Sequence, residues 1–485
     1  SLTLTLREAM QVRSSLPFFE QDFQIVPVPI RYYPHGLSAA HILGYLRSIS
    51  KKEISFFKNK GYLPYEKIGK AGIEEEFEDL LHGKAGKEIQ VVNVYGTVVK
   101  TIFKKEPIAG AKVVLTLDLQ LQKTAENLLK GKKGAIVLMD VRSGEILSLA
   151  SSPAFNPNMF SNQLNKQQWL KIANNPTSPL TNRAIQGLYP PGSIFKPFMA
   201  LAALEEGIIN AETTFYCPGH FYFGNRLFHC HKRTGHKKVN LFKGIVESCD
   251  VYFYHLAERL SIDKIKYWAN QFNFGEKTSI MLSNEKQGLI PSTSWKREKY
   301  KGTPQQRWFK GETLSVIIGQ GAVLITPIQA AVAYAALANG GKVLKPQVVK
   351  KIVKSSGEVI TFAIPQVKRK IPLSEKDKRE ILKALEGVVY NKHGTGKRAA
   401  LASRYKIKIG GKTGTAQVVS LSKFKENKYA FNHHAWFVGL APIENPKVVA
   451  VALVENGGSG GVAAAPLVRK ILESYFDIYP VSTNL

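Results

Sequence analysis

Apolar residues along this chain of 485 residues alternate with polar ones in some stretches and form continuous runs in others. Residues 134–150 contain two strand-like runs around an Arg-Ser-Gly turn, a pattern that predicts a β-hairpin. A long apolar helix is predicted over 328–337, and strand patterns return over 435–440 and 448–454. Because helices are placed between early and late strands, the pattern predicts an α+β domain.

The amino-terminal part of the chain has a different composition, with short alternating stretches rich in Lys, Tyr and Pro. A break over 104–110 precedes a strand-like run at 113–117 and a helix that Asp118 would cap. We therefore place a domain boundary at this break, with one domain over 1–110 and a second over 111–485. The length and the hydrophobic content of 44% are sufficient for two or three domains with their own cores.

The chain is strongly basic, with 67 Lys and Arg against 37 Asp and Glu and a net charge of +30. Such a charge is compatible with nucleic acid or with an anionic membrane surface as a partner. The lysines are scattered along the sequence, and neither a helix-turn-helix pattern nor an aromatic RNA-binding motif is present. We therefore predict no nucleic-acid partner and interpret the charge as a basic surface near a negative membrane leaflet.

Three short motifs follow one another in the order expected of a serine acyl-transfer site: Ser193-Ile-Phe-Lys196, Ser248-Cys-Asp250 and Lys412-Thr-Gly414. Four other Ser-x-x-Lys matches occur, but only Ser193 lies between a Pro-Pro-Gly run and a long apolar stretch. This setting predicts that Ser193 begins a buried helix. Residues three apart on a helix share a face, so Lys196 can reach the serine.

A serine hydroxyl is a weak nucleophile and must lose its proton to a base during attack. Lys196 can be that base only when it is neutral. Burial and a second cation, for which Lys412 is the candidate, would both lower its pKa. Residues 405–417 alternate and then meet glycines, which predicts a strand whose edge a substrate backbone can approach.

The three motifs resemble those of penicillin-recognising acyl-serine transferases, and the chain around them resembles a class B penicillin-binding protein. Segments similar to that family occur at 69–74, 114–122, 318–321, 326–329 and 434–442. Asp250, where many members have Asn, resembles the elongation type, penicillin-binding protein 2. The resemblance implies a transpeptidase domain, which is an antiparallel sheet with helices on both faces plus a helical subdomain, on an elongated amino-terminal pedestal of the dimerisation type.

The resemblance also implies an activity, that of a β-lactam-sensitive peptidoglycan D,D-transpeptidase in lateral wall elongation. Ser193 would attack the penultimate D-alanine carbonyl, with Lys196 as base and Ser248 as proton relay. A carboxylate at Asp250 could pair with either lysine and change which of them is neutral. The substrate would be held by Lys412, Thr413, Gly414 and Thr415, and the amides of Ser193 and Thr415 would form the oxyanion hole.

Two other functions stay open at this point. One is a hydrolytic relative, a D,D-carboxypeptidase or a serine β-lactamase, in which water resolves the acyl-enzyme. The other is a non-catalytic scaffold that binds wall peptides. The resemblance favours the transpeptidase because of the large amino-terminal part.

By the same resemblance, the partners would be peptidoglycan stem peptides, β-lactams, the elongation scaffold protein of the rod complex and a polytopic glycan polymerase. The family normally has one amino-terminal membrane anchor. Residues 323–339, the longest apolar candidate here, are interrupted by Thr, Pro and Gln. We therefore expect a bacterial inner-membrane protein with this portion in the periplasm, held by an anchor that this chain lacks.

All three cysteines of the chain, Cys217, Cys230 and Cys249, lie in one short region that also contains several histidines. Three thiolates and one imidazole make a closed tetrahedral zinc site of the structural kind. We choose His236 as the fourth ligand because the preceding Gly235 allows the chain to turn back. The resemblance agrees, since elongation-type members can bind zinc in the corresponding segment, with Asp in place of the first two cysteines.

Two alternatives to zinc stay open: a Cys217–Cys230 disulfide with Cys249 free, and three buried thiols. Cys249 is the middle residue of the second motif. A metal bound there would therefore hold Ser248 and Asp250 in place.

Overall fold

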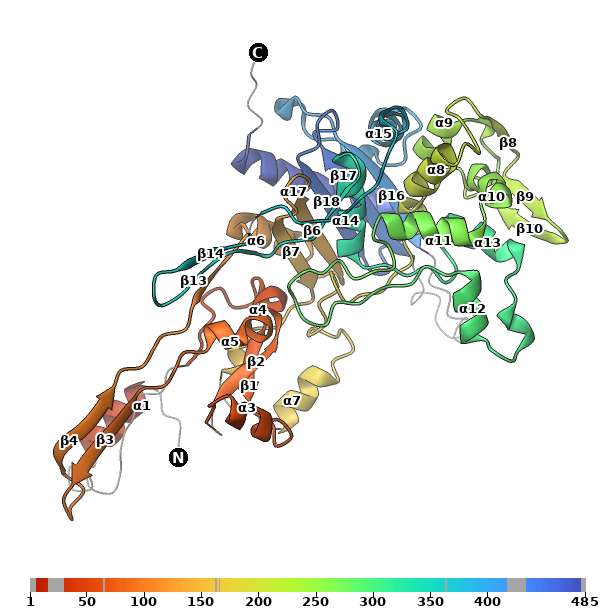
Figure 1. The fold of residues 1–485 in the computed structure, drawn as a ribbon. Coiled ribbons are helices and arrows are strands. Elements are labelled where there is room, and N and C mark those ends of the chain that lie inside the picture. The colour runs from red at the N-terminus through yellow and green to blue at the C-terminus, as the bar shows by residue number, and fades with distance from the viewer. Residues whose placement is uncertain are drawn as a thin grey trace.

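The computed structural model describes residues 6–15, 30–63, 66–161, 164, 166–362, 364–416 and 433–480. An elongated amino-terminal part extends from a broad catalytic part in which one antiparallel sheet is flanked by helices (Figure 1). This arrangement is the predicted α+β architecture, an antiparallel sheet with helices on both faces and a helical subdomain beside an elongated amino-terminal part.

The central sheet has the strand order β16-β17-β18-β6-β7, and every neighbouring pair is antiparallel. Its strands are β6 (Gly134–Asp140), β7 (Ile146–Ser152), β16 (Gly410–Ala416), β17 (His434–Ala441) and β18 (Val448–Val454). The predicted hairpin and the two predicted late strands are therefore confirmed. All seven residues of β18 are buried because helices cover both faces of the sheet.

The strand expected over 405–417 begins later than predicted, at Gly410. Ser403–Tyr405 form a short 3-10 helix, and Lys406 follows with a left-handed φ of 50°. A left-handed residue cannot continue an extended strand, so the strand starts only after it. Residue 417 lies outside the described residues.

Opposite faces of the sheet contact different helices. Ile136 and Leu138 of β6 pack with α6 (Leu119–Leu128) and α17 (Ala465–Ile478). Val137 and Met139 point to the other face, which α14 (Pro327–Ala338) covers. Two predicted features are confirmed here: the apolar helix is α14, and Asp118 caps α6 by accepting N–H bonds from Gln120 and Leu121 at 2.9 and 3.0 Å.

A helical subdomain stands beside the edge strand β16 (Figure 1). Its helices are α8 (Lys196–Glu205), α9 (Leu241–Val246), α10 (Asp250–Arg259), α11 (Ile262–Gln271), α12 (Thr293–Lys299), α13 (Lys310–Ile317) and α15 (Glu375–Tyr390). Two small hairpins lie between α8 and α9. They pair β8 (Phe215–Cys217) with β11 (Lys237–Val239) and β9 (His220–Phe223) with β10 (Arg226–His229). This hairpin region carries Cys217 and Cys230 and places them close to Cys249, the N-cap residue of α10.

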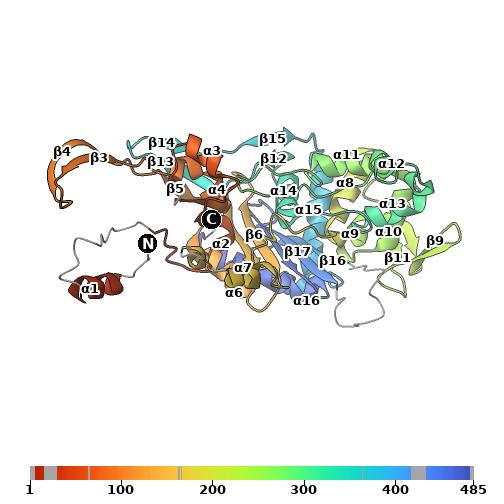
Figure 2. The same ribbon diagram turned by 90° about the horizontal axis from the view of Figure 1, so that it is seen from below.

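The amino-terminal part contains short elements and one long projecting hairpin (Figures 1 and 2). Its elements are α1 (Leu6–Ser15), α2 (Ala40–Leu43), β1 (Tyr45–Ser48), α3 (Ile54–Asn59), β2 (Lys67–Ala71), α4 (Gly72–Glu76), α5 (Glu78–Leu81), β3 (Lys87–Val92) and β4 (Val98–Lys105). Within the described residues, strands β3 and β4 pair only with each other, and all their residues are exposed.

The next strand along the chain, β5 (Lys112–Leu115), already belongs to the catalytic part. It pairs with β13 (Val349–Val353), which also pairs with β14 (Val359–Thr361). The remaining elements are α7 (Lys166–Ala173), β12 (Lys342–Leu344), β15 (Val367–Lys370) and α16 (Gly460–Ala463). The predicted boundary between residues 110 and 111 lies just before β5 and stays a prediction.

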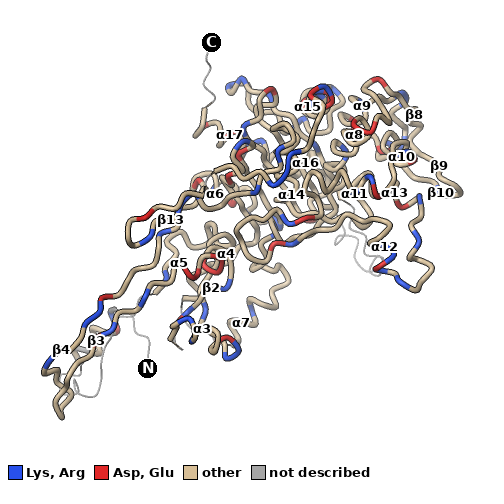
Figure 3. The backbone as a smooth tube through the Cα atoms, in the orientation of Figure 1, with Lys and Arg blue, Asp and Glu red and all other residues tan. Residues whose placement is uncertain are grey.

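Lys and Arg are distributed over both parts of the chain, including the β3–β4 hairpin (Figure 3). Among the described residues, no helix has the length and apolar character needed to cross a bilayer.

Candidate active site

Ser193 lies in a tight turn that presses against the edge of the sheet. The turn is a 3-10 helix, Gly192–Ile194, which leads into α8 at Lys196, so the regular helix begins three residues later than predicted. Gly192 has a φ of +55°, and its N–H donates to the Gly319 carbonyl at 2.9 Å. A Cβ at Gly192 would lie 2.8 Å from the Thr415 carbonyl oxygen, so glycine is what allows the nucleophile turn to meet β16 this closely.

Lys196 is completely buried and makes three polar contacts. Its Nζ donates to Asp250 Oδ1 at 2.7 Å, to the Ser248 carbonyl at 2.8 Å and to Ser248 Oγ at 3.3 Å. Three acceptors match the three N–H groups of an ammonium. The predicted contact with Ser193 is not among the hydrogen bonds of the described residues. In this resting arrangement Lys196 is a cation bound to the second motif.

The second motif places a hydroxyl between the two lysines through an unusual backbone conformation. Ser248 has a left-handed φ of 56°, which costs a non-glycine residue about 1–2 kcal/mol. Cys249 occupies the N-cap position of α10, and Asp250 is its first residue. Strain at Ser248 thus turns its Oγ toward Lys196 and Lys412, while Asp250 lies at the start of the helix, where a negative charge is favoured.

Lys412 of β16 is also completely buried, and its Nζ donates to Ser248 Oγ at 2.9 Å and to the Thr413 carbonyl at 3.3 Å. Burial, and then the positive charge of Lys196, hold the pKa of Lys412 well below its usual range. Burial alone would raise the pKa of Asp250, but Lys196 and a hydrogen bond to His231 lower it below its ordinary value. The site therefore favours a Lys196–Asp250 ion pair and disfavours a second charge on Lys412.

The rest of the third motif lies on the free edge of the sheet. Thr413 Oγ1 lies 2.9 Å from Thr395 Oγ1, and the exposed Thr415 accepts a hydrogen bond from Gln320 Nε2 at 3.1 Å through its carbonyl. A Cβ at Gly414 would lie 2.8 Å from the Pro191 carbonyl oxygen, which keeps this position small. An edge strand of this kind can accept an extended peptide as an additional strand.

A buried network that the sequence reasoning missed holds the Pro-Pro-Gly run before Ser193. Arg183 Nε and the Tyr189 hydroxyl both donate to Glu455 Oε1, at 2.8 and 2.7 Å, and Trp436 Nε1 donates to the Pro190 carbonyl at 3.1 Å. Glu455 begins the glycine-rich stretch after β18, far from Arg183 in sequence. No local pattern connects them, so only the fold reveals this support.

The four predicted metal ligands are brought together and all are buried. The ligand atoms of Cys217, Cys230, His236 and Cys249 lie within 4.8 Å of one another. His236 Nδ1 lies 3.5 Å from Cys217 Sγ and 3.4 Å from Cys230 Sγ. Ordinary zinc bond lengths in a tetrahedron give an S···N separation of about 3.6 Å, so this donor set fits a zinc ion.

Two alternatives to a zinc site were a Cys217–Cys230 disulfide and three buried thiols. All three cysteines are free thiols in the structure, so a Cys217–Cys230 disulfide is not formed. Hydrogen bonds from Cys249 and His236 outweigh burial and lower the pKa of Cys217 to about 6. His231, one of the histidines not chosen as a ligand, is directed instead to Asp250, whose Oδ2 accepts its backbone N–H at 2.8 Å.

Two family models match the chain. The Penicillin binding protein transpeptidase domain matches residues 134–473, and the Penicillin-binding Protein dimerisation domain matches residues 3–115. The fold, the three motifs and these matches define one class, and the chain belongs to the family of penicillin-binding proteins with a transpeptidase domain.

Within this family the resemblance extends to the PBP2 branch, as the motifs indicated. The chain is 40% identical over 441 residues to the peptidoglycan D,D-transpeptidase MrdA of Acinetobacter baumannii, which covers 90% of the chain and 64% of that relative. It superimposes with a TM-score of 0.84 and 32% identity on a chain of the complex between PBP2 and MreC from Helicobacter pylori, covering 98% of this chain and 84% of that one. A chain of a peptidoglycan synthase complex gives a TM-score of 0.80 at 32% identity, covering 98% and 81%.

Proposed function

We propose that this protein is a peptidoglycan D,D-transpeptidase that cross-links stem peptides during wall elongation, with Ser193 as the nucleophile. One observation carries the proposal: two buried lysines converge on Ser248, one of them paired with the Asp250 carboxylate, and the Ser193 turn lies against the edge strand β16. This arrangement combines a proton acceptor, a proton relay and a surface for an extended peptide.

The resting charges suggest how Lys196 becomes the base. Ser248 Oγ lies 3.3 Å from Lys196 Nζ and 2.9 Å from Lys412 Nζ, so it can take a proton from Lys196 while its own hydroxyl proton goes to a neutral Lys412. A substrate carboxylate that arrives beside Lys412 stabilises its charged form and draws the proton in that direction. Lys196 is then neutral and accepts the proton of Ser193.

The chemical steps follow from these positions. Ser193 Oγ bonds to the penultimate D-alanine carbonyl carbon, and its proton goes to Lys196. The carbon–nitrogen bond to the terminal D-alanine breaks, and the leaving amine takes a proton through Ser248. An amine of a neighbouring stem then attacks the ester, forms the cross-link and frees Ser193. The amides of Ser193 and Thr415 are the proposed donors to the oxyanion.

Intact-protein mass spectrometry after incubation with a penicillin tests this proposal. We expect one stable adduct on the wild type, and none on Ser193→Ala. Ser283→Ala is the matched control, because Ser283 also begins a Ser-x-x-Lys sequence but lies outside the site. Rapid drug hydrolysis without an adduct would favour a β-lactamase, and no reaction at all would favour a scaffold.

We also propose that Cys217, Cys230, His236 and Cys249 bind a structural zinc ion. The support is the buried donor set and its separations, which suit a tetrahedron of three sulfurs and one nitrogen. With four protein ligands no position remains for water, so the ion would supply stability. Cys249 would connect it to Ser248 and Asp250. Metal analysis of the purified chain should give one zinc per molecule, and less than half of that would contradict the site.

For the amino-terminal part, we propose contact with an elongation scaffold and a glycan polymerase near the membrane, with the catalytic part in the periplasm. The support is the likeness to a PBP2 chain in complex with MreC and to a chain of a synthase complex. The hairpin offers exposed apolar residues, with Val99 66% and Ile102 63% exposed. The double variant Val99→Lys, Ile102→Glu should weaken binding to a purified scaffold protein without changing penicillin acylation. Unchanged binding would show that the hairpin is not the contact surface.

A further inference from the structure

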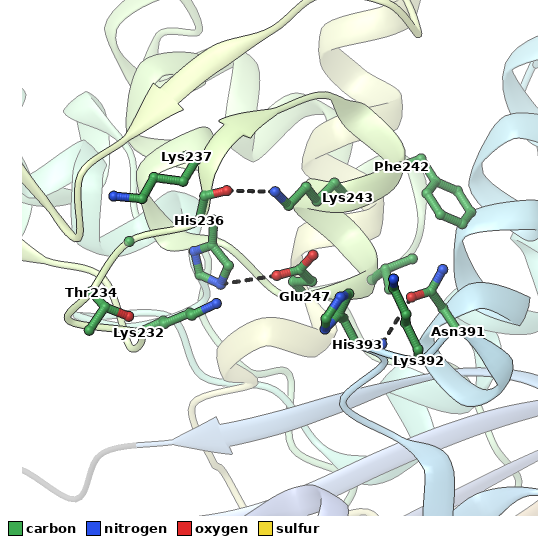
Figure 4. Close-up of a pocket in the computed structure, with 12 residues that line it drawn as sticks. Lys232, Thr234, His236, Lys237, Phe242, Lys243, Glu247, Asn391, Lys392 and His393 are labelled. Carbon is green, nitrogen blue, oxygen red and sulfur yellow. Dashed lines mark hydrogen bonds and ion pairs between the residues drawn. The ribbon is translucent and has the colours of Figure 1, made fainter.

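A cavity of about 600 Å³ lies beside the cysteine region, on the side of the helical subdomain (Figure 4). Its wall comes from three segments: the turn 232–237, helix α9 with the following Glu247, and the loop 391–393 after α15. This volume is in the range of sites that bind small molecules or a few residues of a peptide.

The cavity is strongly positive. Glu247 is its only carboxylate among the lining residues, and that carboxylate faces His236, with 3.9 Å between Oε2 and Nε2. Within the described part of the chain, none of the four lysines that line the cavity forms an ion pair with a carboxylate. These are Lys232, Lys237, Lys243 and Lys392. Uncompensated lysines around a concave surface attract an anion.

The lysines do not all have the same freedom. Lys243 Nζ donates to the carbonyls of His236 and Lys238 at 2.5 and 3.2 Å, so this cation is fixed in the wall. Lys237 and Lys392 are exposed and their ammonium groups are available to a ligand. Phe242 and Val246 of α9 add an apolar surface, and Thr234 adds a hydroxyl. The combination suits an anionic group attached to an aliphatic chain.

The loop that carries Lys392 also reaches the catalytic strand. Two residues beyond His393 in the same loop, the Thr395 hydroxyl lies 2.9 Å from that of Thr413 in the third motif. On the opposite wall, Glu247 immediately precedes Ser248. The loop of the cavity wall therefore reaches the strand of the third motif through the Thr395–Thr413 contact, and Glu247 is the chain neighbour of the proposed proton relay.

We propose that this cavity is a carboxylate-binding subsite for the peptide substrate, separate from the Lys412 and Thr413 site for the D-alanine carboxylate. The inference rests on the proposed function and concerns a carboxylate elsewhere on the stem peptide, on the donor or the acceptor strand. A penicillin has no such extension. Removal of positive charge from the cavity therefore weakens the use of an anionic peptide but leaves acylation by penicillin unchanged.

The test compares Lys392→Glu and Lys237→Glu with Lys130→Glu, which replaces an exposed lysine just after α6 on the other side of the sheet. Release of D-alanine is measured with two synthetic peptides, one with free side-chain carboxylates and one with those groups amidated. For the free-carboxylate peptide we expect each cavity variant to raise KM by on the order of tenfold with little change in kcat. The amidated peptide and the Lys130→Glu control should show no such difference.

Two readouts keep this inference separate from the proposed function. Penicillin acylation of Ser193 must persist in both cavity variants, and zinc content must be unchanged in Lys237→Glu because its neighbour His236 is a proposed ligand. Equal KM values for wild type and variants, or equal losses with both peptides, would overturn the subsite. A wild type that forms no penicillin adduct would instead overturn the proposed function.

Discussion

Two buried polar clusters meet at residues 248–250. Each must balance the charge of its buried side chains, and the two do so in different ways. In the lysine cluster, Asp250 neutralises Lys196 and the depressed pKa of Lys412 removes the second charge. In the cysteine cluster, all four side chains are potential metal ligands. The first cluster is therefore balanced by its own residues and can exchange a proton, whereas the second suits an added cation and can only hold a shape.

The largest expected effect is on the lysine cluster itself. Lys196→Met removes the cation that bonds to Asp250 and Ser248 and the base that activates Ser193. We expect the rate of penicillin acylation to fall by at least about a thousandfold. Stopped-flow or mass-spectrometric acylation rates measure this, and a loss of less than tenfold would mean that another group is the base.

The cysteine cluster gives the next largest effect. Cys249→Ser removes a ligand from the segment that carries Ser248, so we expect loss of zinc, a melting temperature lowered by about 5 °C or more, and slower acylation. Cys217→Asp replaces the sulfur ligand with a carboxylate oxygen, which zinc also accepts, and should retain most of the zinc. Equal zinc loss in both variants would contradict the chosen ligand set. Full acylation without zinc would show that the lysine cluster works independently of the metal.

Asp250 touches both clusters, because its Oδ1 accepts from Lys196 and its Oδ2 from the His231 backbone. Asp250→Asn leaves Lys196 without its counter-charge, beside a Lys412 whose charged form is already disfavoured. We expect acylation to slow by about tenfold, because an amide can still hydrogen-bond to Lys196 but does not hold its charge. Zinc content should be unchanged. A change in zinc content would show that Asp250 belongs to the metal site as well.

The smallest effect concerns stability and pH. The pKa of Lys412 is lower in the folded protein than in the unfolded chain, where it is ordinary, so between these two values the unfolded state binds more protons. The free energy of unfolding should therefore gain a contribution as pH rises through this window, and should lose it as pH falls. Lys412→Met should flatten this part of the pH dependence in thermal melts at pH values below the ordinary lysine pKa of about 10.4. An unchanged slope would mean that Lys412 is charged.

The sequence predicted the members of both clusters but not their internal contacts. The cysteines and His236 lie close together in sequence, so their composition alone indicated a site. The direction of Lys196 depended on the left-handed φ of Ser248, which no sequence pattern reveals. The buried pair of Arg183 and Glu455 and the positive cavity were missed for a related reason. Each joins residues that are distant in sequence and meet only after the sheet has formed.

For the fold, the strands with clear apolar runs and the helix caps were predicted, because burial on both faces and capping leave local signals. The start of β16 was placed too early, because alternation continues through residues that the left-handed Lys406 keeps out of the strand. Alternation of polar and apolar residues does not reveal a single residue at which the backbone leaves the extended conformation.

The strand order of the central sheet also determines when the enzyme can first act. Strand β18 lies between β17 and β6, with Val451 opposite Val137, so the sheet closes only after the late strands have been synthesised. A growing chain therefore carries Ser193 and Lys196 long before Lys412 and the strands that frame them. Contacts so distant in sequence form slowly. A newly made molecule should thus be insensitive to penicillin until the strands that follow Lys412 have been synthesised and paired.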